Sequence, residues 1–242
     1  MSIGMSKPKS ETEIIIRCHP ALKPYIPEPK LSEVFFPDWF KEAKSNVESD
    51  LIGAEAIRTI KHCPPVIDAY RHGFMMPLLA DLIIKDGYIT WNWDIPNLPE
   101  EFYIRSPISF HEPAQLAGFP IKMKENLAIK FMNLWSLQPP DGWSLIFTHP
   151  FNRPDLPFHS LTGKVDCDLF HSGLVHFPAI WIDDDFEGIL QAGTPVVQVI
   201  PVPRVDLKLT LKSMSEKEQQ ETKTVQSQLS KDSGQYRKNY RA

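Results

Sequence analysis

The residues best suited to metal chemistry are two adjacent pairs, Cys18-His19 and His62-Cys63. Two Cys and two His side chains can complete a tetrahedral zinc site. Adjacent side chains of an extended strand point to opposite faces, however, so both members of a pair rarely reach one metal. We therefore interpret these residues as buried cysteines and ordinary histidines, and we expect no metal site in the chain.

Four histidines lie close together in the sequence, at His149, His159, His171 and His176. A metal triad of histidine and carboxylate needs a pair such as HxD or HxE together with a distant histidine, and this stretch lacks that spacing. Scattered histidines of strands and loops are the simpler interpretation. A metal-binding or small-ligand-binding β-barrel that uses the stretch from His149 to His176 stays open as an alternative.

The motifs of the commonest nucleophile and phosphate sites are absent. The chain has no GxSxG elbow for a serine nucleophile, and it has neither GxxxxGK[ST] nor GxGxxG for a phosphate. The run Asp183-Asp184-Asp185 lacks the alternating spacing of an EF-hand calcium loop, so we interpret it as a solvated turn.

One stretch has a more specific pattern of carboxylates and glycines. Residues 163–168 read GKVDCD, and further on residues 185–200 read DFEGILQAGTPVVQVI. Gly193 allows a tight turn before an apolar strand, and Gln198 projects from that strand opposite its neighbours. The order and spacing of these two segments form the most informative pattern in the chain.

These segments resemble the dUTPase and dCTP-deaminase family, in which a GVIDxDYxG motif precedes a strand of the form FxIxxGxxIAQL. Residues 129–132 and the turn at residues 140–143 are similar to the strand and turn before the phosphate loop of that family. The resemblance covers residues 125–204 and implies a β-clip fold, a distorted barrel of short strands, in a trimer with sites between subunits. It also implies that Asp166 is the carboxylate that accepts a proton from the attacking water.

Several family residues are replaced in this chain. The phosphate loop corresponds to Thr148–Pro154, which keeps Arg153 but has no Arg-Ser pair, and Leu169 stands where the family has an aromatic residue. The glycine-rich C-terminal phosphate clamp is absent. A triphosphate needs several donors or cations around it. The resemblance therefore implies a β-clip-like scaffold without most of the catalytic motifs.

The candidate site residues follow from this resemblance. Asp166 is the candidate catalytic residue, and the candidate ligand-binding residues are Arg153, Asp168, Gln198 and His149. We expect no resident cofactor. Mg²⁺ bound together with a nucleotide is expected only if the chain is a diverged nucleotide hydrolase.

A second resemblance concerns residues 62–69, residues 74–84 and the loop 148–154. These segments are similar to an uncharacterised protein family found in marine phages and some bacteria. That family has no established activity, so the resemblance implies a phage context and no mechanism.

The elements that must position these residues follow from composition and periodicity. The 242 residues include 23 Pro, 14 Phe, 6 Trp and 6 Tyr but only 11 Gly. We therefore expect a mainly β fold, with a minor α+β part, of short strands joined by proline-rich loops. A short helix is predicted near residues 65–72, because Pro is tolerated in a first helical turn and Gly suits the end. Helical spacing of apolar residues predicts another helix over residues 40–58.

Strands account for most of the remaining chain. The dipeptide Asp86-Gly87 between two apolar runs predicts a hairpin of residues 74–84 with residues 88–93. The clearest later strands are predicted at residues 127–132, 144–147, 173–181 and 195–200.

The C-terminal tail, residues 208–242, differs in composition from the rest. It has no Pro, one Gly, and 8 Lys and Arg against 4 Asp and Glu, so we expect it to be helical or disordered. The chain is accordingly divided into N-terminal strands, a helix and a hairpin that wrap the core (1–124), a β-clip-like core (125–207) and the tail (208–242).

Charge and composition restrict the class of protein. With 26 Lys and Arg against 30 Asp and Glu, the net charge is −4, which does not suit a dedicated nucleic-acid binder. No apolar run is long enough for a membrane span. Three Cys form no disulfide framework, so we expect a reducing compartment, the host cytoplasm, or the virion if the chain is phage-encoded.

Three functional hypotheses remain open. The first is a non-catalytic, phage-type, β-rich assembly or binding protein that forms a homo-oligomer such as a trimer and contacts phage structural proteins. The second is a diverged dUTPase-like or dCTP-deaminase-like nucleotide hydrolase that uses Asp166, Arg153 and Gln198. The third is the ligand-binding β-barrel with its histidine-rich stretch.

Overall fold

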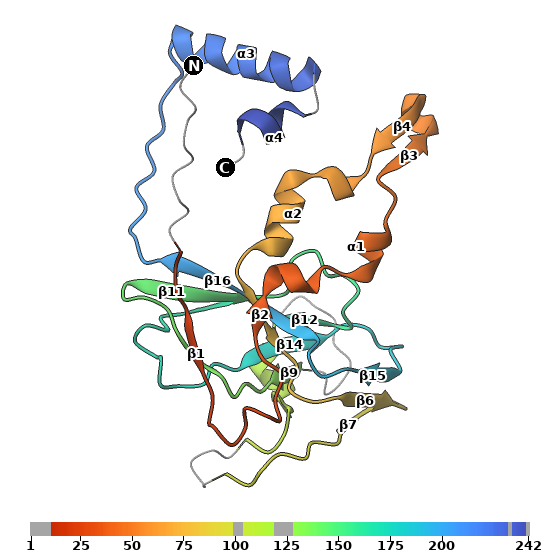
Figure 1. Ribbon diagram of the computed structural model, residues 1–242, viewed down its shortest axis with the longest axis vertical. Helices are drawn as coiled ribbons and strands as arrows, with labels where there is room; N and C mark the ends of the chain where they lie inside the picture. Colours follow the sequence, from red (N-terminus) through yellow and green to blue (C-terminus); the bar gives the residue numbers. More distant parts are fainter. Residues whose placement is uncertain (1–10, 99–103, 119–127, 232–233, 241–242) are drawn as a thin grey trace. The chain divides into compact units, whose positions relative to one another are not determined.

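A computed structural model describes residues 11–98, 104–118, 128–231 and 234–240. Contacts divide the chain into two units, Met1–Arg204 and Val205–Ala242. The first unit is mainly β, as the composition predicts, with short strands joined by loops and short helices (Figure 1). No helix of the described residues is both long and apolar enough to cross a membrane.

The first half of this unit alternates short strands with short helices. Its elements are β1 (Ile15–Arg17), β2 (Lys30–Leu31), η1 (Ser32–Phe35), α1 (Asp38–Glu42), β3 (Asn46–Ser49), η2 (Asp50–Ile52), β4 (Ala54–Arg58), η3 (Ile60–His62), α2 (Pro64–Arg71), β5 (Phe74–Pro77), β6 (Leu82–Lys85), β7 (Tyr88–Trp91), β8 (Ile108–Phe110) and η4 (Pro113–Leu116).

The second half of the unit is built from strands. They are β9 (Ala128–Phe131), β10 (Ser136–Gln138), β11 (Trp143–Thr148), β12 (Phe158–Ser160), β13 (Gly163–Val165), β14 (Phe177–Trp181), β15 (Gly188–Leu190) and β16 (Pro195–Pro203).

The described strands are hydrogen-bonded in five antiparallel sheets. Their strand orders are β13-β11-β16-β5-β2, β12-β14-β9-β8, β15-β6-β7, β1-β10 and β3-β4. Ring contacts join the two larger sheets: Phe147 of β11 stacks on Phe177 of β14 with ring centroids 5.5 Å apart. Because these strands form separate sheets, the distorted barrel of the β-clip stays an expectation.

β16 lies at the centre of the largest sheet, where it pairs with β11 on one side and β5 on the other. Its pairing with β5 ends at Val199, and Pro201 and Pro203 follow where only β11 is paired. Because proline has no N–H to donate, a strand tolerates it where one edge is free. The buried half of β16 thus carries valines, and the end that leads to Arg204 carries prolines.

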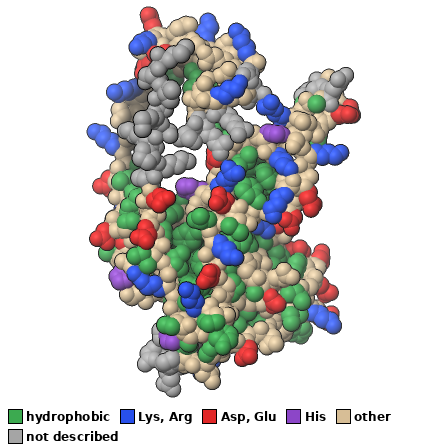
Figure 2. Space-filling model, in the orientation of Figure 1, with side chains coloured by type: hydrophobic (Ala, Val, Ile, Leu, Met, Phe, Trp, Pro, Cys, Tyr) green, Lys and Arg blue, Asp and Glu red, His purple; other side chains and the backbone are tan. Residues whose placement is uncertain are grey.

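The surface of the first unit keeps some large apolar side chains exposed. Green areas lie between the charged side chains on the face shown in Figure 2. Exposed members of the unit include Tyr25, Leu31, Val34, Tyr88, Phe110, Leu169 and Ile189.

The short helix and the hairpin that the sequence predicts are confirmed. α2 spans Pro64–Arg71, with its prolines in the first turn. β6 and β7 form the hairpin, and Asp86 and Gly87 adopt φ values of 51° and 78° between them. Two consecutive positive φ angles are the requirement of the tight turn that Asp-Gly favours.

The predicted helix over residues 40–58 is wrong. α1 ends at Glu42, and the remainder is the β3–β4 hairpin, in which Val47 pairs with Ile57. The turn between the strands ends at Gly53, which has a φ of 59°. A left-handed glycine ends a helical segment, and β-branched residues favour strands, so the pairing outweighs the helical spacing.

The predicted single strand over residues 74–84 is also wrong. It is divided into β5 and β6, which belong to different sheets. The intervening residues turn against the loop before β16: the Leu78 N–H donates to Thr194 O at 2.7 Å, and the Ala192 N–H donates to Asp81 Oδ1 at 2.7 Å. Contacts distant in sequence therefore divide a run that is apolar except for Asp81.

The second unit contains two helices, α3 (Glu216–Lys231) and α4 (Gln235–Asn239). Ser215 begins α3 with a capping box, because its hydroxyl accepts from the Glu218 N–H while the Glu218 carboxylate accepts from the Ser215 N–H. No described residue of α3 is buried. Residues 205–214 belong to neither a helix nor a strand.

Candidate functional site

Asp166 follows β13 directly and lies beside the start of β11. The Ser144 hydroxyl donates to Asp166 Oδ1 at 2.5 Å, and Nη1 of Arg204 lies 3.6 Å from the same oxygen. The side chain of Asp166 is 45% exposed. The register of β11 with β13 places this carboxylate, since Leu145 pairs with Val165. Asp166 is thus oriented and open to solvent on one side.

Asp168, two residues further on, is surrounded by donors. Both terminal nitrogens of Arg204 donate to it at 2.5 Å, and the N–H groups of Gly142 and Leu169 donate at 2.9 Å. Its side chain is only 3% exposed. The hydrogen bonds and charge of Arg204, with those two amides, hold the pKa of Asp168 well below its usual range. A carboxylate occupied in this way has no free oxygen for a ligand.

Arg204 is the residue of this cluster that the sequence analysis missed. Its backbone N–H donates to Gly142 O at 2.7 Å, and its Nη1 also donates to Trp143 O at 3.2 Å. The end of β16 is thereby fastened to the turn before β11. The sequence offered one weak signal, an arginine directly after a long buried strand.

His149 begins the loop that follows β11. Its Nδ1 accepts the Ser160 N–H at 3.3 Å, so Nε2 carries the proton and donates to Arg153 O at 3.1 Å. The ring stacks on His159 with centroids 4.5 Å apart. Burial lowers the pKa of His149, and this outweighs the hydrogen bond to the Arg153 carbonyl, which raises it. His149 is therefore held neutral, as a structural part of the loop.

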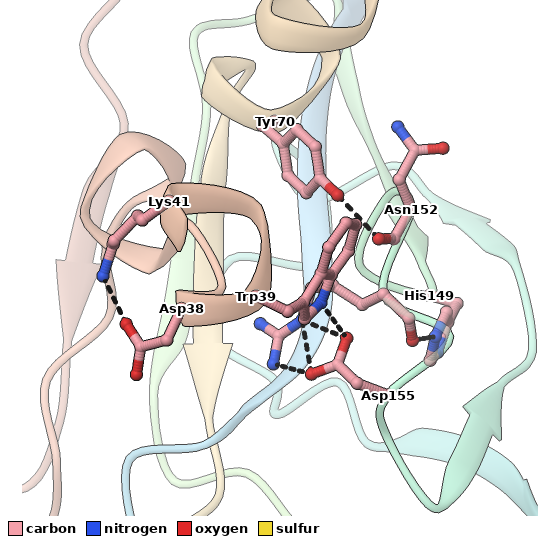
Figure 3. Close-up of polar contacts among 8 residues, drawn as sticks. Asp38, Trp39, Lys41, Tyr70, His149, Asn152 and Asp155 are labelled. Atoms are coloured by element: carbon pink, nitrogen blue, oxygen red, sulfur yellow. Dashed lines mark hydrogen bonds and ion pairs between the residues drawn. The ribbon is translucent and has the colours of Figure 1, made fainter. Parts of the chain in front are cut away.

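Arg153 is turned toward Asp155. Its Nε lies 2.9 and 3.1 Å from the two carboxylate oxygens, and its Nη2 lies 2.8 Å from Oδ2. The indole N–H of Trp39 donates to Oδ1 of the same carboxylate at 3.1 Å. Burial raises the pKa of Asp155, but the hydrogen bonds and charge of Arg153 and the Trp39 bond outweigh it, so this pKa lies below its usual value. The guanidinium charge of Arg153 is thus neutralised by Asp155, and Figure 3 shows Trp39 bonded to the same carboxylate.

Gln198 is completely buried in β16. Its amide donates to Ala69 O at 2.9 Å and His72 O at 2.6 Å, and its Oε1 accepts the Phe151 N–H at 2.9 Å. The amide joins the end of α2, β16 and the loop after β11. Tyr70 supports the same loop, because its hydroxyl donates to Asn152 O at 2.8 Å (Figure 3).

The structure therefore arranges the predicted site residues in two groups. Asp166 and Asp168 lie at the start of β11, and His149, Arg153 and Gln198 lie at its other end. His149 lies five residue steps along the strand from Ser144, which corresponds to about 17 Å. Within one chain the two groups do not share a site.

A shallow hollow of about 590 Å³ lies beside the second group. Its lining includes Val34, Asp38, Trp39, Lys41, Arg153, Asp155 and the turn at residues 191–195. Both of its cations are paired, Arg153 with Asp155 and Lys41 with Asp38 at 2.9 Å. Trp39 is 42% exposed and Val34 is 59% exposed. The hollow thus combines an aromatic surface with polar groups and has no surplus charge among these residues.

Metal-binding side chains do not gather in the described residues. No group of three His, Cys, Asp or Glu side chains there could hold a metal ion. Cys18, Cys63 and Cys167 are free thiols, and His176 accepts the Asn133 N–H at 3.1 Å. Neither the Cys-His pairs nor the histidine-rich stretch brings three such side chains together among the described residues.

Comparison with known proteins gives partial similarities. No family model and no curated protein matches this chain. The dUTPase of Staphylococcus bacteriophage 80alpha is 17% identical, with a TM-score of 0.27, over 40% of this chain and 73% of the phage protein. The dUTPase of phage phi11 of S. aureus is 14% identical, with a TM-score of 0.26, over 46% of this chain and 99% of that protein.

Both are phage dUTPases. They belong to the family that the motifs of residues 163–200 resemble. A similarity with these scores covers less than half of the chain and supports no conclusion about its activity.

Proposed function

We propose that this chain is a non-catalytic β protein that acts by binding or assembly, as a homo-oligomer, in a phage context. It would work in the host cytoplasm or in the virion. One observation carries the proposal: the groups that a nucleotide hydrolase would direct at its substrate are bonded inside the chain. Asp168 accepts hydrogen bonds from four N–H donors, and Arg153 is paired with Asp155. Both the nitrogen and the oxygen of the Gln198 amide form hydrogen bonds within the chain.

The charges around Asp166 also oppose a phosphate site. Asp166, Asp168 and Arg204 together carry a formal charge of −1, and the guanidinium is committed to Asp168. Cleavage of a nucleoside triphosphate needs donors or cations where negative charge develops. A triphosphate at Asp166 would meet a carboxylate and a cation that is already neutralised.

In this proposal the hollow beside Trp39 is the binding surface. The indole orientation is fixed by its bond to Asp155, so the ring is an aromatic surface that loses little freedom on binding. With both cations paired, the surface suits a partner that offers apolar and hydrogen-bonding groups rather than a strongly charged one. Such a partner is a polypeptide segment of a neighbouring protein.

The direct test measures nucleotide turnover and binding. The purified full chain is incubated with deoxynucleoside and nucleoside triphosphates and Mg²⁺, and phosphate, pyrophosphate and deaminated product are assayed. We expect no turnover and no change in melting temperature at millimolar nucleotide, since a ligand that binds only the native state would raise it. Turnover that Asp166→Asn abolishes, and that Asp94→Asn on an exposed position leaves intact, would overturn the proposal.

A diverged nucleotide hydrolase is the second candidate, because Asp166 keeps the exposure and orientation that a general base needs. The oxygens of Asp168 are occupied, so Asp166 is the carboxylate that could contact Mg²⁺ brought by a nucleotide. Under this candidate, Mg²⁺-dependent pyrophosphate release requires the Asp166 carboxylate. The turnover assay above decides between the two candidates.

A further inference from the structure

The three-stranded sheet β15-β6-β7 has one face against the core and one face toward solvent. Its strands lie side by side at the lower right of Figure 1, with β6 in the middle. Leu82 and Ile84 of β6 and Leu190 of β15 are buried in the core of the first unit. Alternate residues of a strand point to opposite faces, so the residues between these three point outward.

The pairing registers arrange the outward residues in three rows across the strands. In the middle row, Ile83 of β6 lies between Ile189 of β15 and Thr90 of β7. Continuing the same registers by one residue gives the outer rows. All residues of the three rows are exposed, and we call them together the outer face: Glu187-Lys85-Tyr88, Ile189-Ile83-Thr90 and Gln191-Asp81-Asn92.

Two hydrogen bonds hold both ends of β15 against β6. The Ala192 N–H donates to Asp81 Oδ1 at 2.7 Å, and the Asp86 N–H donates to Glu187 Oε1 at 3.3 Å. The carboxylates of Asp81 and Glu187 are thereby fixed at opposite ends of the outer face. The order of its charges is therefore a property of the folded sheet.

The middle row is apolar although it faces solvent. Ile83 and Ile189 are 40% and 57% exposed, and they are direct neighbours across the two strands. Tyr88, which is 74% exposed, extends the apolar surface toward one end. Isolated exposed apolar side chains are normal, but an apolar stripe with a polar rim is typical of a contact surface.

The charges of β6 are complementary to those of a second, reversed copy of β6. Its outward residues are Asp81, Ile83 and Lys85, so a negative charge, an apolar side chain and a positive charge follow one another. A two-fold rotation about the middle row reverses the strand direction of the second copy. Asp81 of each copy then lies opposite Lys85 of the other, and the two Ile83 side chains meet.

The same rotation also matches the flanking strands. Glu187 then lies opposite Gln191 of the second copy, and Tyr88 lies opposite Asn92 of the second copy, so that each pair can form a hydrogen bond. A two-fold axis along the strands would instead place like charges of β6 opposite each other, which opposes association. The outer face is thus complementary to itself in one orientation, as a two-fold interface requires.

We propose that the outer face of one copy packs on the outer face of a second copy, with antiparallel strands, and forms a two-fold interface. The occupant is a second copy because the reciprocal pairs need the same three strands on both sides. Stacked sheets pack about 10 Å apart, which lets side chains of the two faces interdigitate. This interface rests on the assembly role proposed above, and it names the surface that performs it.

The small size of the outer face predicts a weak contact. A standard interface uses roughly 20–30 residues on each side, many more than the three rows provide. Self-association of the full chain is therefore measured by sedimentation equilibrium at chain concentrations from about 5 to 500 μM. We expect the parent chain to self-associate within this range.

The first test removes the centre of the outer face. Ile83→Ser deletes its central apolar side chain, and Val47→Ser on β3 is the matched control, because Val47 is a β-branched strand residue that is 38% exposed. We expect Val47→Ser to associate like the parent chain. Ile83→Ser should raise the dissociation constant at least tenfold, because apolar burial at the centre of the contact is lost. Circular dichroism establishes that both variants are folded.

The second test reports the orientation of the two copies. Asp81→Lys places lysines opposite each other, and Lys85→Glu places carboxylates opposite each other, so each variant alone should have half the mass of the parent assembly. In a mixture of the two variants, opposite charges meet at both contacts of β6, and the mass of the parent assembly should return. High ionic strength should weaken this recovery. A variant that is merely destabilised would not recover on mixing.

Three results would contradict the inference. They are a parent chain that stays monomeric throughout the concentration range, an assembly that Ile83→Ser leaves unchanged, and folded charge variants whose mixture stays at half the parent mass. An assembly that resists Ile83→Ser would show that the copies associate through another surface. None of these results involves nucleotide turnover, so failure of the outer face and failure of the non-catalytic function are separate outcomes.

Discussion

Arg204 holds Asp168 through both of its terminal nitrogens, each 2.5 Å from a different carboxylate oxygen, although 36 positions separate the two residues. The pair joins the end of β16 to the segment after β13 at the edge of the largest sheet. Planar, two-point pairing is a property of arginine that lysine cannot reproduce. The carboxylate that the family motif would assign to ligand binding therefore has a structural partner.

Removing this pair should lower stability. We expect Asp168→Asn and Arg204→Lys each to lower the urea midpoint. Arg204→Lys removes the two-point partner of the nearly buried Asp168, and Asp168→Asn leaves the partly exposed Arg204 without its paired carboxylate. Lys41→Ala breaks an ion pair whose side chains are 56% and 84% exposed, and it should leave the midpoint unchanged. Equal midpoints for all three variants would show that the Arg204 pair contributes nothing to stability.

The same pair predicts an acid-dependent loss of stability. The pKa of Asp168 is lowered in the folded chain from a usual value of 3.8, chiefly by Arg204. The contribution of ionised Asp168 to the free energy of unfolding is therefore complete above the pKa that Asp168 has in the unfolded chain. It is lost as pH falls below that value toward the lower pKa of the folded chain. The difference in unfolding free energy between the parent chain and Asp168→Asn should shrink as pH decreases below about 4. Denaturant titrations at several pH values measure this difference.

Replacing Gln198 with an apolar residue should lower the free energy of unfolding substantially. Gln198→Leu keeps the side-chain size but leaves the Phe151 N–H and the carbonyls of Ala69 and His72 without this partner. We expect a loss of about 2–3 kcal/mol in unfolding free energy. Gln228→Leu, on the exposed surface of α3, is the matched control and should change stability by less than about 0.5 kcal/mol. Similar values for the two variants would contradict the joining role of Gln198.

Two glycines with similar backbone angles should differ in how well they tolerate substitution by alanine. Gly73 has a φ of 69°, and a Cβ atom there would lie 1.9 Å from the carbonyl oxygen of Val199. Gly53 has a φ of 59°, and nothing lies within 4 Å of its Cβ position. Gly53→Ala should cost about 1 kcal/mol for its left-handed backbone. Gly73→Ala should cost about 3 kcal/mol or more, because α2 must also move away from β16. Thermal unfolding of both variants tests the order.

The stability of the folded chain should also depend on pH near neutrality, because of His149. Its pKa is lowered in the folded chain from a usual value of 6.5, mainly by burial. The unfolded chain binds the proton more readily, so the contribution of neutral His149 is present above pH 6.5 and decreases as pH falls below it. His149→Asn should flatten the stability profile between about pH 5 and 7, whereas His171→Asn on an exposed residue should not. A profile that His149→Asn leaves unchanged would show that this ring titrates as freely in the folded chain as in the unfolded one.

Local patterns predicted the elements that depend on neighbouring residues. The hairpin at Asp86-Gly87 and the helix that begins at Pro64 follow from turn and capping chemistry, which acts over a few residues. The spacing of Val47, Leu51 and Ile57 misled the prediction for residues 40–58, because cross-strand pairing and Gly53 outweigh a weak helical period.

For the candidate site, sequence alone identified Asp166, Asp168, Arg153, Gln198 and His149 as polar residues of a loop-and-strand region. It could not show which of them have partners, because those partners lie far along the chain. Arg204 reaches Asp168, and Gln198 reaches Ala69 and His72, only after β16 has entered the sheet.

The amino-acid sequence determined the mainly β composition and the short hairpin, since these depend on residue type and period alone. Tertiary structure decided which charges are neutralised and which polar side chains are buried with their partners. An ion pair and a buried amide need two atoms within about 3 Å of each other, and only the folded chain brings such distant residues to that distance.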